Sequence, residues 1–185
     1  ILVAGRISGI PRSKLYRITC ISTDSNGKAG IPISLRISKK NGEFAARIAL
    51  QAGGWYHIGI ELLDEHDHAI CKVDVNHVGV GEVFITAGQS NAANSGTNRL
   101  APMSDLVSAR NLHHWQVAKD PQPIATNDRG SPWPVMADAL VDALHIPVGL
   151  ISVGVGGTAV STWLPGKATA RGGLSGPERL LARVV

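Results

Sequence analysis

A serine directly follows a short apolar run and a glycine near the middle of the chain. The run Val83–Ala87 is mostly apolar and rich in β-branched and aromatic side chains, which favours a buried strand of an α/β sheet. Gly88 then lets the backbone turn sharply, and Gln89, Ser90 and Asn91 follow. Because open α/β sheets place active sites at the carboxyl ends of their strands, the Ser90 hydroxyl is a candidate nucleophile.

The words G-Q-S-N at 88–91, placed after an apolar strand, resemble the first motif of the SGNH-type esterases. More narrowly, they resemble the sialate O-acetylesterase and acetylxylan esterase branch. The motif is not the G-x-S-x-G nucleophile elbow, because Ala92 occupies the second glycine position. The resemblance implies a serine esterase that removes O-acetyl groups from a carbohydrate and needs no metal or organic cofactor. An ordinary strand-to-loop turn with polar residues is the alternative interpretation.

A strand, helix and strand in succession predict a parallel α/β unit in the second half of the chain. Leu106–Leu112 reads as a weak strand. Apolar residues repeat at helical spacing in Pro132–Leu144, with Ser131 expected as the N-cap and Pro132 as the first helical residue. Ile146–Val153 then predicts a second buried strand.

A glycine-rich loop follows that second buried strand. Its bare N–H groups can point to the same sheet edge as Ser90, where they would stabilise the oxyanion of ester cleavage; losing one such donor costs on the order of 3 kcal/mol. In the resembled family a G-G-T/S segment followed by Trp lies beside the nucleophile. The resemblance therefore implies oxyanion or pocket roles for Gly156, Gly157, Thr158 and Trp163, for Gln89 and Asn91 beside the serine, and, less specifically, for Gly130. A plain tight turn remains the alternative for the glycines.

The same loop also fits a dinucleotide-binding fingerprint. Gly154, Gly156 and Ala159 have the required spacing, and Glu178 lies where a ribose-binding acid would be expected. That fingerprint needs a helix that starts inside the loop, and Pro165–Gly166 would break such a helix. We therefore favour the oxyanion role.

A serine nucleophile needs a base, and the base needs an orienting acid. SGNH enzymes carry both in a D-x-x-H motif. Asp142 and His145 have this spacing, but they end the predicted helix and so should lie at the amino edge of the sheet, opposite Ser90. We expect His145 to stabilise the helix C-terminus instead.

His113 and His114 follow the weak strand and are expected to be surface residues, with substrate contact as the alternative. Only two or three strands of a doubly wound core are recognisable, whereas the resembled fold needs about five. We therefore expect the catalytic His and Asp beyond Val185, in a C-terminal remainder of the same protein.

The first segment, residues 1–78, alternates between apolar and polar residues. Turn signals separate five predicted strands, and Asn41–Gly42 predicts a hairpin. The strands are Leu15–Ile21, Ile33–Ile37, Phe44–Leu50, Tyr56–Leu62 and Ala69–Val75. Their regular spacing predicts a small antiparallel, immunoglobulin-like β-sandwich. Residues 79–185 would then form the first half of a doubly wound, parallel-sheet domain of the SGNH, flavodoxin-like type. Without an aromatic platform, the sandwich is expected to pack or position rather than to bind carbohydrate.

The first segment also holds the two cysteines. Cys20 and Cys71 both fall on the apolar phase of a predicted strand. Two interpretations therefore remain, two buried free thiols or one cross-strand disulfide. Its histidines lack metal-site spacing, and we expect ordinary solvated residues at His57, His66, His68 and His77.

The composition is that of an ordinary soluble globular protein, with 185 residues, 44% hydrophobic and 17% charged. The net charge of +4 is scattered and aromatics are only 4%, which argues against nucleic-acid binding. No apolar run approaches a membrane span. No signal peptide is visible, but an acetylated carbohydrate substrate implies a secreted or periplasmic protein. The alternative to an enzyme is a non-catalytic protein, a carbohydrate-binding or adhesion module on an inactive esterase fold.

Overall fold

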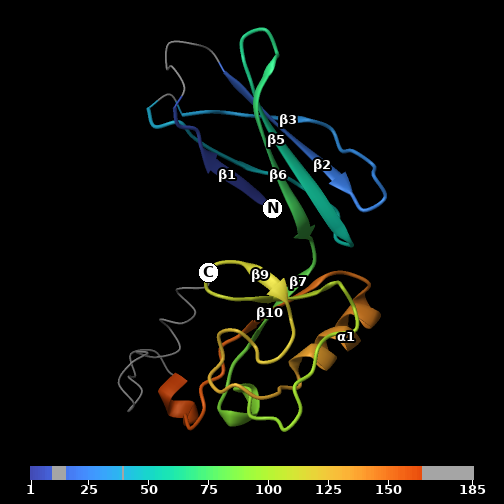
Figure 1. Ribbon diagram of the computed structural model, residues 1–185, viewed down its shortest axis with the longest axis vertical. Helices are drawn as coiled ribbons and strands as arrows, with labels where there is room; N and C mark the ends of the chain where they lie inside the picture. The colour runs from blue at the N-terminus through green and yellow to red at the C-terminus, as the bar shows by residue number, and fades with distance from the viewer. Residues whose placement is uncertain (10–15, 39, 164–185) are drawn as a thin grey trace. The chain divides into compact units, whose positions relative to one another are not determined.

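The computed structural model describes residues 1–9, 16–38 and 40–163, and the chain divides into two compact units, Ile1–Val80 and Gly81–Val185 (Figure 1). Each unit has its own sheets and its own core. The predicted helix break at Pro165–Gly166, the acidic Glu178 and the chain near Val185 lie outside the described residues.

The first unit contains two antiparallel sheets around one apolar core. The larger has the order β3-β2-β5-β6 and the smaller pairs β1 with β4. The strands are β1 (Leu2–Arg6), β2 (Arg17–Asp24), β3 (Ile33–Leu35), β4 (Glu43–Arg47), β5 (Trp55–Leu63) and β6 (Ala69–Gly79). Buried residues from both sheets form a single cluster, among them Val3 of β1, Ile18 of β2 and Ile58 of β5. The alternation in the sequence thus marks the residues that meet between the sheets.

The turn predicted at Asn41–Gly42 is present, but it does not close an ordinary hairpin. The Ser38 N–H donates to the Glu43 carbonyl at 2.7 Å, and the Gly42 N–H donates to the Ser38 carbonyl at 2.9 Å. Among the described residues of this turn, a single bridge, Ile37 with Phe44, pairs the two sides. The strands on either side, β3 and β4, belong to different sheets, so this turn carries the chain from one sheet to the other.

The two cysteines are free and differ in environment. Cys20 is buried in the core, and this burial raises the pKa of its thiol. Cys71 is exposed, so the prediction that both thiols are buried is wrong for Cys71. The reason is that Cys71 lies on β6, the edge strand of its sheet, whose residues are almost all exposed.

The second unit is built on a four-stranded sheet of order β7-β10-β8-β9. Its strands are β7 (Glu82–Thr86), β8 (Val107–Arg110), β9 (Trp115–Val117) and β10 (Val148–Ser152). β10 pairs in parallel with β7 on one side and with β8 on the other. β9, which the sequence pattern did not predict as a strand, folds back antiparallel onto β8. The sheet is therefore mixed rather than purely parallel.

Helix α1 (Trp133–Leu144) packs against β8 and β10. Its Ala137 and Val141 join Val107, Val148 and Leu150 in one buried cluster, as the helical spacing predicts.

The predicted cap is displaced by one residue: Pro132, not Ser131, is the N-cap. The Ser131 hydroxyl donates to the Asp120 carboxylate at 2.6 Å and accepts a long hydrogen bond, 3.4 Å, from the Trp133 N–H.

β7 forms one edge of the sheet among the described residues. The prediction of a fully buried strand is wrong in this respect, because Val83 and Ile85 are 53% and 50% exposed. No helix in the described part of the chain is long and apolar enough to span a membrane.

Candidate active site

Ser90 begins a short helical turn directly after β7. Gly88 has a φ of +145°, a backbone angle that side chains disfavour, and so allows the strand to break sharply. The 3₁₀ turn η1 (Ser90–Ala92) follows, closed by hydrogen bonds from Ala92 N–H to the Gln89 carbonyl at 2.9 Å and from Ala93 N–H to the Ser90 carbonyl at 3.0 Å. We call residues 88–93 the serine turn. Ser90 is partly exposed at the carboxyl end of β7.

The glycine-rich loop after β10 lies directly against the serine turn. Pairing between the two strands continues past their ends, because Val153 N–H donates to the Thr86 carbonyl at 2.8 Å and Val155 N–H to the Gly88 carbonyl at 2.9 Å. A Cβ at Gly154 would lie 2.1 Å from the Ala92 carbonyl oxygen, so only glycine fits there. The two loops predicted to converge therefore meet at the same sheet edge. We call residues 154–158 the glycine loop.

The two central glycines of this loop differ in the state of their amides. The Gly156 N–H donates to the Thr126 hydroxyl at 2.8 Å and is therefore occupied. Gly157 is exposed with a φ of +73°, and its N–H has no acceptor among the described residues. The Ser90 N–H is likewise without a described acceptor. The amides of Ser90 and Gly157 are thus among those at this edge that no described acceptor occupies.

Gly130 does not supply such a donor. Its N–H donates to the Gly96 carbonyl at 3.1 Å, and its own carbonyl accepts from Gly96 N–H at 2.7 Å. A Cβ at Gly130 would lie 1.6 Å from the Asn98 carbonyl oxygen. Gly130 is therefore required for the close approach of two backbone segments, and the expected role as an oxyanion glycine is not open to its amide.

Thr158 and Trp163 lie together at the end of the glycine loop. The Trp163 indole N–H donates to the Thr158 hydroxyl at 3.0 Å, and that hydroxyl donates to the Val155 carbonyl at 2.8 Å. The Trp163 ring also packs on the apolar cluster of Ile151 and Val153. The hydrogen bond and the packing fix the ring beside the glycine loop. Gln89 and Asn91 are exposed on the serine turn.

Sequence reasoning missed a third segment at this edge, Thr126–Asn127. The Thr126 N–H donates to the Gly154 carbonyl at 2.9 Å, while its hydroxyl accepts from Gly156. The Asn127 amide donates to the Ala93 carbonyl at 2.9 Å and to the Ser95 hydroxyl at 2.8 Å. These residues follow no strand and match no motif, so no periodicity in the sequence marks them.

Asn94 anchors that third segment through buried hydrogen bonds to the residues just before it. It is fully buried, has a φ of +52°, and donates from its amide to the Gln122 carbonyl at 3.0 Å and the Ala125 carbonyl at 3.3 Å. Its side-chain oxygen accepts from the Gln122 N–H at 2.8 Å. The only sequence signal was a second Asn three residues after Asn91.

Asp120 is a second buried anchor. Its carboxylate accepts from Leu100 N–H at 3.1 Å, from Ser131 N–H at 2.8 Å and from the Ser131 hydroxyl at 2.6 Å. The Gln122 amide also donates to it, at 3.2 Å. All of these donors belong to the surrounding loops, and together they occupy the carboxylate oxygens. Asp120 therefore holds these loops in place rather than orienting a catalytic histidine.

The histidines of the second unit do not contact Ser90. His145 caps the C-terminus of α1, just before β10 begins, and so lies at the amino edge of the sheet with Asp142 nearby in the chain. His113 and His114 are exposed in the β8–β9 turn. No described side chain hydrogen-bonds the Ser90 hydroxyl.

The histidines of the first unit are engaged in local contacts. The His57 ring bonds Asn76 at 2.5 Å and Asp74 at 2.9 Å, and His77 meets Trp55 edge-on. His66 and His68 follow Asp64 in a turn, and their N–H groups donate to its carboxylate. These hydrogen bonds, that of His68 above all, lower the pKa of the Asp64 carboxyl. Within the ranges that the structure describes, no three His, Cys, Asp or Glu side chains gather as a metal site.

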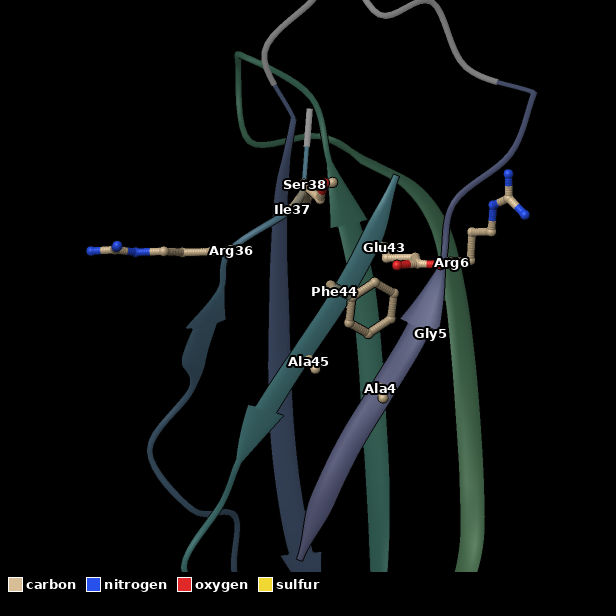
Figure 2. A pocket seen from close by; sticks show the side chains of 9 residues that line it. All are labelled: Ala4, Gly5, Arg6, Arg36, Ile37, Ser38, Glu43, Phe44 and Ala45. Atoms are coloured by element: carbon tan, nitrogen blue, oxygen red, sulfur yellow. The ribbon is translucent and has the colours of Figure 1, made fainter. Parts of the chain in front are cut away.

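A shallow hollow in the first unit is a weaker candidate site. It lies between β1, β4 and residues 36–38, and Figure 2 shows the Phe44 ring at its centre with the ends of Arg6 and Arg36 directed outward. The Glu43 carboxylate accepts from the Asn41 amide at 2.6 Å. The lining residues that the structure describes do not direct a set of polar groups into this hollow, as a binding or catalytic site requires.

Comparison with known proteins identifies the family. The model of the carbohydrate esterase family described as sialic acid-specific acetylesterase matches residues 80–174, slightly more than half of the 185 residues. The chain therefore belongs to this family. The matched region contains the serine turn and the glycine loop together.

A solved structure supports the fold. The chain is similar to a carbohydrate acetylesterase from Xanthomonas citri, with a TM-score of 0.51 and 18% sequence identity over 88% of this chain. It spans only 38% of the length of that protein. A comparison with curated proteins found no match.

Proposed function

We propose that the protein is a serine esterase that removes O-acetyl groups from a carbohydrate, with Ser90 as the nucleophile. One observation carries this proposal: the hydrogen bond from Val155 N–H to the Gly88 carbonyl holds the glycine loop against the serine turn. A hydroxyl and free backbone amides then share one sheet edge, which is the arrangement that acyl transfer needs. Membership of a carbohydrate esterase family supports the substrate class.

In the proposed reaction, the Ser90 oxygen attacks the acetyl carbonyl carbon. The resulting oxyanion accepts hydrogen bonds from the N–H groups of Ser90 and Gly157, which no described acceptor occupies. The base that took the Ser90 proton gives it to the sugar oxygen as the ester C–O bond breaks, and the sugar leaves as an alcohol. Water then attacks the acyl-serine and releases acetate. Thr158, Trp163, Gln89 and Asn91 would shape the pocket for the sugar. No step requires a metal or an organic cofactor.

We propose further that the base and its orienting acid come from the chain beyond Val185. The histidines of the second unit stand in the β8–β9 turn and at the amino edge of the sheet, without contact to Ser90. The exposed edge of β7 supports the idea that further strands complete the sheet. The matched structure is much longer than this chain, which agrees with a larger catalytic domain.

The first unit is proposed to be an immunoglobulin-like sandwich that packs or positions, and the second to be the first half of an SGNH-type domain. Because polymeric carbohydrates lie mostly outside cells, a secreted or periplasmic location is part of the proposal. Whether the acetyl group sits on a sialic acid or on xylan is decided by assay.

The test is acetate release from O-acetylated sialic acid and from acetylated xylan oligosaccharides by the full-length natural protein. We expect release from one of these classes, and loss of at least a thousandfold in Ser90→Ala because the nucleophile is removed. Ser108→Ala, a serine on β8 away from this edge, is the matched control and should retain activity. Undiminished release by Ser90→Ala, or no release from any acetylated sugar by the natural protein, contradicts the proposal.

A further inference from the structure

Thr126 and Asn127 join the two loops on which the proposed chemistry depends. Toward the glycine loop, the Thr126 N–H donates to the Gly154 carbonyl at 2.9 Å, and its hydroxyl accepts from Gly156 N–H at 2.8 Å and donates to the Gly154 carbonyl at 3.5 Å. Toward the serine turn, the Asn127 amide donates to the Ala93 carbonyl at 2.9 Å. Neighbouring residues of one segment thus hold both loops at once.

The position of Asn127 fits this bridging role. Its φ of +68° lies in the left-handed region that asparagine tolerates better than most residues, and its side chain is directed back to Ala93 and Ser95. A Cβ at Gly156 would lie 3.3 Å from the Asn127 amide nitrogen, so the glycine loop packs against this side chain. The segment is itself fixed through Asn94, whose amide donates to the Asn127 carbonyl at 3.4 Å.

The hydroxyl of Thr126 also decides which amide of the glycine loop stays free. By accepting from Gly156 N–H it removes that donor, while the next amide, that of Gly157, is left without a described acceptor. A preorganised oxyanion donor must point at the developing charge without reorganisation, because even small misplacement lowers the rate.

We propose that Thr126 and Asn127 are positioning residues that lock the serine turn to the glycine loop and assign the second oxyanion donor to Gly157. This rests on the proposed esterase function. Neither residue touches the reacting atoms. Each acts through the loops that carry Ser90 and Gly157.

The test measures kcat and KM of the full-length protein with 4-methylumbelliferyl acetate, normalised to the serines titrated by a fluorophosphonate. We expect Thr126→Val to lower kcat about ten- to a hundredfold with KM changed less than about threefold, since a displaced donor weakens transition-state binding above all. Thr126→Ser keeps the hydroxyl and should restore most of kcat. Thr97→Val removes an exposed hydroxyl that makes no hydrogen bond within the described residues, and should match the natural protein.

Asn127→Asp provides a second, independent variant. It keeps the shape and the left-handed backbone but cannot donate to the Ala93 carbonyl, so a similar fall in kcat is expected. If Thr126→Val does not fold, the kcat of Asn127→Asp alone tests whether this segment positions the two loops. The proposal is overturned if both folded variants keep kcat per titrated serine within threefold, or if Thr126→Ser is as impaired as Thr126→Val. Activity that persists in Ser90→Ala is a different result, and refutes the esterase function itself.

Discussion

Replacing Asn94 with alanine should destabilise the second unit more than any exposed substitution in it. Asn94 is fully buried, and its side chain accepts from Gln122 N–H at 2.8 Å and donates to the Gln122 carbonyl at 3.0 Å. Leaving the buried N–H unpaired costs roughly 1–3 kcal/mol, and losing the carbonyl bond about 1 kcal/mol more. The φ of +52° adds roughly 1–2 kcal/mol for alanine. We expect a loss of roughly 3–6 kcal/mol, a large part of an ordinary stability of about 5–15 kcal/mol.

The assay is equilibrium unfolding in urea followed by tryptophan fluorescence, with hydrogen exchange over residues 118–131 as a local probe. His145→Ala is the control, because His145 has a similar φ of +56° but is exposed and makes no side-chain hydrogen bond within the described residues. It should lose only the backbone contribution, roughly 1–2 kcal/mol. If Asn94→Ala costs no more than His145→Ala, the buried hydrogen bonds do not anchor the loop and the reasoning fails.

Two further predictions concern the ends of the sheet. His145→Gly should stabilise the second unit by about 0.5–1 kcal/mol, because glycine suits the left-handed cap of α1, and should leave esterase activity unchanged; lost activity in a folded variant would return His145 to the catalytic candidates. Gly154→Ala should cost about 1–3 kcal/mol or more and lower activity, because its Cβ would lie 2.1 Å from the Ala92 carbonyl oxygen. Gly157→Ala, whose Cβ would meet no atom within 4 Å, should show only the backbone cost, so equal unfolding midpoints for these two variants would disprove the close contact.

The strands and the helix could largely be predicted from the sequence, because each carries its own periodicity. Alternation placed β2 and β5, and helical spacing placed α1 within one residue of its observed start. β9 was missed because three residues with two of them exposed give no pattern to detect. Cys71 was misjudged because alternation shows which face a residue occupies but not whether another sheet covers that face.

The candidate site was predictable only where it follows a strand. Ser90 and the glycine loop come directly after β7 and β10, so parallel pairing alone brings them together. Thr126, Asn127 and Asn94 lie in irregular chain and act through hydrogen bonds between segments about 30 residues apart, as between Thr126 and Gly156. The sequence suggested that the Gly130 amide could serve as an oxyanion donor. In the fold this amide is hydrogen-bonded to Gly96, a pairing between distant segments that no local pattern reveals.

The central claim is that the hydroxyl of Ser90 is an activated nucleophile, and locating a covalent adduct tests it most directly. The full-length protein would be treated with a fluorophosphonate, digested, and analysed by mass spectrometry. The account predicts a phosphonyl group on the peptide that contains Ser90, and no labelling after Ser90→Ala. An adduct on a different serine, or an unlabelled protein, would contradict it, and the second result would favour a carbohydrate-binding module on an inactive esterase fold.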